Sequence, residues 1–165
     1  MTDLFDVELR IRVVRCLFRL LIVLSLSAPA FAYDATAKLV AAATAGRESD
    51  VRELLVQGVD ANTKNGSGRP VLVTAGFNGN RRTALVLLAA GADVNAVDAT
   101  GTSALMAASA FGHRELVDVF LVAGADPNLK DSAGKSALAR ATLAGHTEVV
   151  EALKAAGAVE DKGKK

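Results

Sequence analysis

Cysteine, histidine and the large aromatic residues are scarce in this 165-residue chain, which contains one cysteine, two histidines, one tyrosine and no tryptophan. The single thiol, Cys16, can form no disulfide within one chain, and no cluster of cysteines is available to bind a metal. The chain is long enough for one domain with a real core. That core cannot depend on disulfides or on thiolate-bound metal.

Net charge is also nearly absent. The chain has 19 basic and 18 acidic residues. Four arginines and three acidic residues fall within the first 32, which leaves 15 of each sign from Tyr33 onward. A neutral domain lacks the electrostatic footprint that nucleic acids or anionic membrane surfaces require. We therefore expect neither of these as a partner.

Residues 1–32 have the layout of a secretory signal peptide. Four arginines, the first at Arg10 and the last at Arg19, precede an apolar run over residues 20–27, and small residues follow up to Ala32. A positive region, a short apolar segment and an A-x-A site are the parts of such a signal. We predict cleavage after Ala32, with Ala30 as second choice, and hence a periplasmic or secreted protein. A leader retained as a membrane anchor, or a buried N-terminal helix, stays open as an alternative.

The rest of the chain repeats with a fixed period, which is the interval from Gly58 to Gly91. The sequence GADVN at 91–95 recurs one period earlier as GVDAN at 58–62 and one period later as GADPN at 124–128, and Gly157 begins a further copy. A fixed period of this length indicates a repeat array. We place four units at about 33–64, 65–97, 98–130 and 131–161, followed by a Lys-rich tail over residues 162–165.

Each unit contains the pattern of two short helices. Residues 115–122 carry apolar side chains at helical spacing. Residues 103–111 are small or apolar, with a serine at the N-cap position and a glycine after the end. We expect the core to contain Leu72, Leu87, Leu105, Leu121 and Leu138.

Together these features resemble the ankyrin repeat. The third unit has the family's order of turn, first helix, Gly-His at 112–113, second helix and Gly-Ala-Asp-x-Asn at 124–128. The resemblance implies an all-α solenoid of four helix-turn-helix repeats joined by short β-hairpin-like turns, over residues 33–161. The family's Thr-Pro-Leu-His motif is Ser-Ala-Leu-Met at 103–106, and the loss of its histidine predicts hairpins that are held more loosely.

No constellation of catalytic residues emerges from the sequence. His113 and His146 each follow a glycine, and we interpret them as turn residues because no further metal ligand lies nearby. The repeated Asp and Asn of residues 91–95 fail the spacing of a calcium loop and are expected to bind backbone groups in turns. We expect a protein that is not an enzyme and that holds neither a metal nor a cofactor.

The resemblance implies that partners bind at the hairpin tips and on the first helices, which line the concave side in this family. Mapped onto this sequence, the candidate partner-binding residues are Arg69, Phe77, Asn78, Thr100, Thr102, Ala110, Phe111, Lys135 and Leu143. For Phe77 and Phe111 both an exposed apolar row and burial between repeats fit the sequence. Leu85, where the other units carry polar residues, is expected on the outer face as a second contact.

The leading hypothesis for function is an exported, monomeric protein–protein interaction module that docks one protein of unknown identity on its concave surface. Its size and leader also resemble exported bacterial ankyrin-like proteins associated with oxidative-stress defence, which implies that it protects or assists an exported enzyme. The alternative is an immunity or inhibitor protein that occludes a toxic exported enzyme, and a neighbouring toxin gene would favour it. No membrane contact is expected after cleavage of the signal.

Overall fold

A computed structural model describes residues 34–160 of the chain. The predicted signal peptide (1–32) and Lys-rich tail (162–165) lie outside the described residues, and residues from Thr36 onward form one compact unit. Residues 34–44 are helical. The helices that follow are α2 (Glu48–Val56), α3 (Val71–Asn78), α4 (Arg81–Ala89), α5 (Ala104–Ala110), α6 (Arg114–Val122), α7 (Ala137–Ala144) and α8 (Thr147–Ala155). The prediction of an all-α repeat fold is confirmed.

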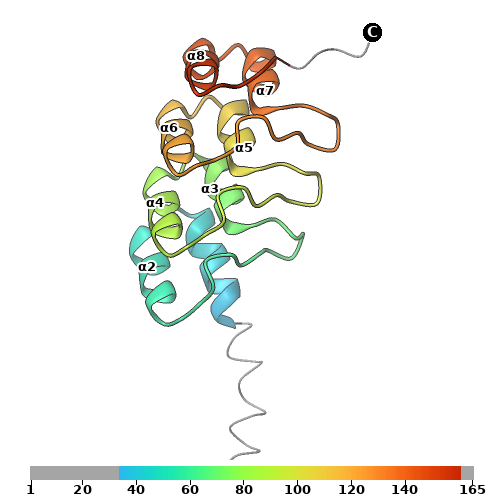
Figure 1. Cartoon of the computed structure of the whole chain (residues 1–165). Coiled ribbons are helices and arrows are strands. Elements are labelled where there is room, and N and C mark those ends of the chain that lie inside the picture. Colours follow the sequence, from blue (N-terminus) through green and yellow to red (C-terminus); the bar gives the residue numbers. More distant parts are fainter. Residues whose placement is uncertain (1–33, 161–165) are drawn as a thin grey trace, which may run out of the picture. The chain divides into compact units, whose positions relative to one another are not determined.

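The helices stack in two parallel rows (Figure 1). The first helix of each unit (34–44, α3, α5 and α7) belongs to what we call the inner row, and the hairpin loops project from its side. The second helices (α2, α4, α6 and α8) form the outer row. The main contacts join neighbours within each row and the two helices of each unit. Because each unit packs on its neighbours, the array is a solenoid.

The helix ends follow local sequence signals. Ser103 and Ser136 cap α5 and α7, since each Oγ accepts a hydrogen bond of 3.3 Å from the backbone N–H three residues later. The predicted N-cap role of Ser103 is confirmed, and Ser136 has the same role one unit later. Gly79 and Gly145 follow α3 and α7 in the left-handed conformation, with φ of +69° and +77°, which favours glycine at these positions.

The core lies between the two rows and is mostly aliphatic. Four of the five predicted core leucines are at most 2% exposed: Leu72, Leu87, Leu105 and Leu138. The prediction for Leu121 is wrong, because Leu121 is only partly buried and Phe120, with no exposed surface, takes the equivalent place. Leu121 lies one position beyond a full period from Leu87, and a shift of one position turns a helix by about 100°.

The repeated Asp and Asn bind the backbone, as predicted. Asp60, Asp93 and Asp126 each accept a hydrogen bond of 2.9 Å from the N–H two residues later. The asparagines reach the next unit: Asn95 Oδ1 accepts a 2.9 Å hydrogen bond from the N–H of Asp126, and Asn62 and Asn128 make the equivalent bonds. The aspartates thus close the turns, and the asparagines form a ladder that joins successive units.

Both histidines also join units, which confirms their interpretation as structural residues. His113 Nε2 lies 3.2 Å from the carbonyl oxygen of Phe77, and His146 Nε2 lies 3.2 Å from that of Ala110. A carbonyl oxygen only accepts, so Nε2 carries the proton in both rings. Asn80, at the equivalent place one unit earlier, donates its amide to the carbonyl oxygen of Ala43 at 2.9 Å.

Candidate binding surface

An aromatic pair lies at the C-terminal ends of α3 and α5. The ring centroids of Phe77 and Phe111 are 5.7 Å apart, and the ring planes meet at 72°, an edge-to-face arrangement that favours contact beyond simple burial. Phe111 is 57% exposed, whereas Phe77 packs partly against the core. The sequence left open both an exposed apolar row and burial between repeats. Phe111 fits the first alternative and Phe77 the second.

Cationic and imidazole groups fix these rings in place. The Arg69 guanidinium carbon lies 4.4 Å from the ring centroid of Phe77, within the range of a cation–π contact. Arg69 Nε also donates to Asp98 Oδ2 at 3.3 Å, and the arginine side chain stays 38% exposed. The His113 ring stacks on Phe111 with centroids 6.2 Å apart. Arg69 and Phe111 thus border the same surface in fixed conformations.

One carboxylate closes each of the later two hairpins. Asp98 Oδ1 accepts hydrogen bonds from the backbone N–H of Thr100 at 2.9 Å and of Thr102 at 3.0 Å. Burial opposes the charge on Asp98, but hydrogen bonds from the Thr100 hydroxyl, from these N–H groups and from Arg69 outweigh it. The pKa of the Asp98 carboxyl therefore lies below its usual value of 3.8.

Asp131 repeats this arrangement one unit later. Its Oδ1 accepts from the backbone N–H of Ala133 at 2.8 Å and of Lys135 at 2.9 Å. Arg140 of α7 donates to Asp131 Oδ2 at 2.5 Å. Burial again opposes the charge, but the hydrogen bonds and the Arg140 cation hold the pKa of Asp131 below its usual value of 3.8.

Successive hairpins are connected, although the motif histidine is missing. The backbone N–H of Ser132 donates to the carbonyl oxygen of Thr100 at 2.9 Å, and Arg140 Nη2 donates to the hydroxyl of Thr102 at 3.1 Å. Arg69 makes the corresponding link from the first hairpin to Asp98 in the second. The expected looser hold is therefore offset by contacts of another kind.

Thr102 is a correction to the predicted site, because it is only 3% exposed and its hydroxyl is used by Arg140. It offers a partner almost no surface. The Thr102 side chain faces the neighbouring hairpin, and the spacing of the repeats alone could not indicate this orientation. Residues at the same place in other units, Arg69 and Lys135, have longer side chains that reach solvent.

The remaining predicted residues lie where the repeat pattern placed them. Leu143 is 71% exposed on α7, and Lys135 and Thr100 are exposed in the hairpins. Asn78 is exposed and donates to the carbonyl oxygen of Thr44 at 3.1 Å, and Ala110 is partly buried. The structure brings Phe77 into contact with both Arg69 and Phe111 and leaves the others spread over the inner row and the hairpins.

The sequence reasoning missed Asp98, Asp131 and Arg140, which hold the hairpins, and Asp98 also positions Arg69. A signal was present, since the equivalent position in the first hairpin is Asn65, which closes its loop in the same way through bonds to the N–H groups of Ser67 and Arg69. An Asn or Asp at this one place in three successive units is a loop-closing pattern. No sequence signal indicated that Arg140 would reach back to its own hairpin.

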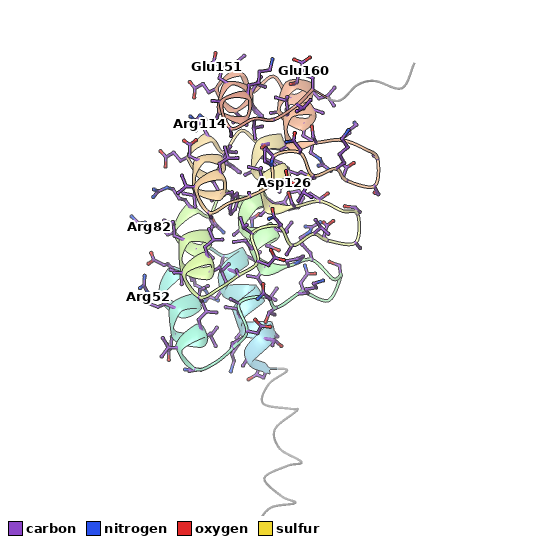
Figure 2. All side chains as sticks on the ribbon, viewed as in Figure 1. Arg52, Arg82, Arg114, Asp126, Glu151 and Glu160 are labelled. Atoms are coloured by element: carbon purple, nitrogen blue, oxygen red, sulfur yellow. The ribbon has the colours of Figure 1, made fainter. Side chains whose placement is uncertain are left out.

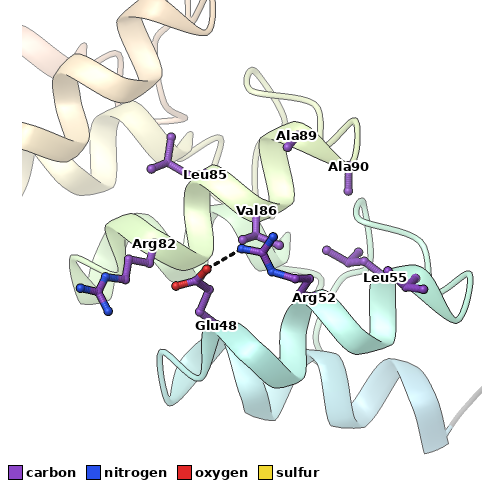
Figure 3. Close-up of a pocket in the computed structure, with 9 residues that line it drawn as sticks. Glu48, Arg52, Leu55, Arg82, Leu85, Val86, Ala89 and Ala90 are labelled. Carbon is purple, nitrogen blue, oxygen red and sulfur yellow. Dashed lines mark hydrogen bonds and ion pairs between the residues drawn. The ribbon is translucent and has the colours of Figure 1, made fainter.

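The outer row also carries exposed apolar side chains. Leu85 is 40% exposed, as predicted, and Val56 and Val122 are 84% and 91% exposed. A groove runs between α2 and α4 (Figure 3), and its α4 wall includes Leu85 and Ala89. A second groove, between α4 and α6, has Leu85 and Ala89 on one wall and Val122 on the other. Leu85 therefore separates two grooves.

Two further properties concern residues 34–160 only. Within this range no group of three or more His, Cys, Asp or Glu residues is placed to hold a metal ion. No helix in the same part of the chain has the length and apolar character needed to cross a membrane.

Comparison with known proteins gives one family. A family model described as Ankyrin repeats (3 copies) matches residues 38–131, which is more than half of the chain. A search of curated proteins finds no significant match.

Proposed function

This chain belongs to the ankyrin-repeat family, and on that premise we propose that it is an exported module that binds a protein partner through its inner row and hairpin tips. Ankyrin repeats are protein–protein interaction modules of a non-catalytic kind. The observation that carries the proposal is the exposure of large apolar side chains on the inner row, 57% for Phe111 and 71% for Leu143. Exposed apolar side chains of this size mark interaction surfaces.

The surroundings of Phe111 suit docking on a preformed surface. Arg69, Phe77 and His113 hold one another through ring contacts and hydrogen bonds. A partner therefore loses little affinity to the ordering of these side chains. Aromatic residues and arginine also dominate the energetics of protein interfaces. We infer a preformed site in which Phe111 is the main anchor and Arg69 supplies polar contacts.

The partner can be found and the surface tested in one series. The protein is purified from the periplasm, where its N-terminal sequence should begin at Tyr33, and its partners are captured and identified by mass spectrometry. Phe111→Ala should then weaken binding of the captured partner by about 2 kcal/mol or more, because the anchor is lost. Titration calorimetry measures the change, and circular dichroism checks the fold.

Val159→Ala is the matched control, since Val159 is 65% exposed near the end of the described chain and lies off the inner row. It should leave the affinity unchanged. Equal binding by the wild type and Phe111→Ala would show that the inner row is not the docking surface. A mature protein that still begins at Met1 would contradict the predicted cleavage after Ala32.

The leader also supports an exported enzyme as the partner, with two opposite consequences. A protector in oxidative-stress defence leaves the enzyme active in the complex and extends its lifetime in peroxide. An inhibitor that occludes a toxic enzyme abolishes its activity at one-to-one stoichiometry. The activity of the captured enzyme, measured with and without the ankyrin-repeat protein, distinguishes the two.

A further inference from the structure

The outer row presents a line of side chains whose charges reverse from one end to the other. The same outward position of the repeat unit is Arg52 in α2, Leu85 in α4 and Asp118 in α6. All three are solvent-exposed, Arg52 by 63%, Leu85 by 40% and Asp118 by 50%. In order along the row they are cation, apolar and anion. A second copy turned end for end would therefore present the complementary order.

One helical turn further on, the corresponding line is apolar and symmetric. It consists of Val56, Ala89 and Val122, four residues after the first line in each helix. Val56 and Val122 have the highest exposed fractions among the large apolar side chains of the described residues. The two valines flank the small Ala89, so this line is the same from either direction. A second copy that covers this line would remove its apolar side chains from water, which favours association.

We propose that the outer row is a homodimer interface with a two-fold axis parallel to α4 and passing beside Leu85. Rotation about this axis keeps the helix direction and reverses the order of the helices. It places α4 over α4 and α2 over α6 of the second copy. Arg52 then faces Asp118 of the second copy twice, once on each side of the axis, as an isologous contact requires.

The apolar line and the grooves fit the same arrangement. Val56 of one copy faces Val122 of the other, and the two Leu85 side chains meet at the axis. The groove between α2 and α4 lies over the groove between α4 and α6 of the second copy, and both are walled by Leu85 and Ala89. Ala89 leaves room beside the axis for the leucine of the facing helix.

Existing ion pairs do not block this contact. Arg52 bonds Glu48 at 2.6 Å within α2, and Asp118 pairs with Arg114 within α6. Exposed pairs of this kind contribute little on their own, so both side chains can contact a second copy. Figure 2 shows Arg52 and Arg114 on the side of the molecule away from the hairpins, which leaves the partner surface of the inner row uncovered.

Repulsion between like charges limits how much of α4 can take part in the interface. Arg81 and Arg82 begin α4, and rotation about the axis brings the same arginines of the second copy near them. Arg81 is partly neutralised by Glu115 at 3.8 Å, and Arg82 lines the groove beside Glu48 (Figure 3). Close contact is therefore confined to the later turns of α4. We expect a reversible dimer in place of the monomer expected from the sequence.

The first measurement is the mass of the purified protein by sedimentation over a range of concentrations. The wild type should have the mass of two chains at high concentration and of one chain on dilution. Leu85→Glu should have the mass of one chain throughout, because it buries two carboxylates at the axis. Glutamate occupies the same position in α8 as Glu151, so the variant should fold. A wild type that stays monomeric, or a Leu85→Glu that dimerises, overturns the proposal.

A charge exchange tests the geometry itself. Arg52→Glu and Asp118→Arg each place like charges at both contacts, and each should weaken self-association at least about tenfold. An equimolar mixture of the two variants restores opposite charges at both contacts, so it should form a heterodimer of wild-type affinity. Glu151→Arg, in the same line but outside the paired helices, should change nothing. Failure of the two variants to pair on mixing would overturn the proposed axis, whatever the inner row binds.

Discussion

At the scale of single residues, glycine meets two demands where the inner helices end. Gly112 has a φ of +72°, in the left-handed region that other residues rarely adopt. A Cβ at this position would also lie 2.6 Å from Nδ1 of His146. That imidazole belongs to the next unit and bonds the carbonyl oxygen of Ala110. Gly112 therefore makes room for a side chain that joins two repeats.

Comparison of two glycines separates these demands. Gly145 has a φ of +77°, and a Cβ there would meet no atom within 4 Å. Gly145→Ala should lower the free energy of unfolding by about 1–2 kcal/mol, the cost of the backbone conformation. Gly112→Ala should cost about 1–3 kcal/mol more, because the imidazole must also move. Urea unfolding measures both, and equal losses would contradict the packing argument.

Burial of individual residues was the least predictable property. Leu121 and Thr102 were both placed from their resemblance to neighbouring units, and both differ from the expectation. Phe111 lies one position beyond a full period from Phe77, so one ring is partly buried and the other exposed. A displacement of one residue changes which side of a helix faces the core. The period therefore predicts the elements well and the orientation of single side chains less well.

At the scale of the element, each hairpin depends on one loop-closing side chain more than on strand pairing. Two of the hairpins contain a single bridge each, between Lys64 and Pro70 and between Val97 and Ser103. The loops were predictable from their glycines and their position in the unit. The ion pairs with Asp98 and Asp131 were not, because Arg69 and Arg140 come from outside the loops that these carboxylates close.

Because of these two carboxylates, we expect the free energy of unfolding to depend on pH. Folding lowers both pKa values from 3.8, so the stabilisation is complete above that value and is lost as the pH falls through the folded pKa. Asp98→Asn with Asp131→Asn keeps the loop-closing acceptor, as Asn65 shows, but removes the charge. At pH 7 the double variant should be less stable by about 1–3 kcal/mol.

Urea unfolding at a series of pH values measures this difference. The gap between the wild type and the double variant should be constant from pH 7 to about pH 5. It should shrink as the pH falls below 3.8, where the wild-type carboxylates become protonated. A gap that stays the same down to pH 2 would mean that the charge does not contribute.

At the scale of the whole molecule, the asparagine ladder connects the repeats one after another. Each asparagine of the ladder bonds a backbone N–H in the following unit, at 2.8 to 2.9 Å. The array and its four units were predictable because the ladder, the turns and the helix ends all recur with the same period. The inner and outer surfaces were less predictable, because they consist of the residues that do not repeat.

Hydrogen exchange can measure one rung of this ladder. Asn95→Ala removes the acceptor of the Asp126 N–H, so that amide should exchange faster, and the free energy of unfolding should fall by about 1 kcal/mol. The Val159 N–H, which bonds Asn128 in the next rung, is an internal control and should keep its protection. Unchanged exchange at Asp126 would show that the bond is not maintained in solution.

The ladder also determines how such a chain can lengthen. The second and third units each end with an asparagine that reaches forward, and each receives one from the unit before it, as Asn62 bonds Asp93 and Asn95 bonds Asp126. A copied segment of one full period, inserted between two units, brings its own backbone N–H donor and its own asparagine acceptor. Duplication of one unit in the gene therefore leaves no backbone group of the ladder unpaired at either junction, and the binding surface can grow by whole repeats without redesign of the rest.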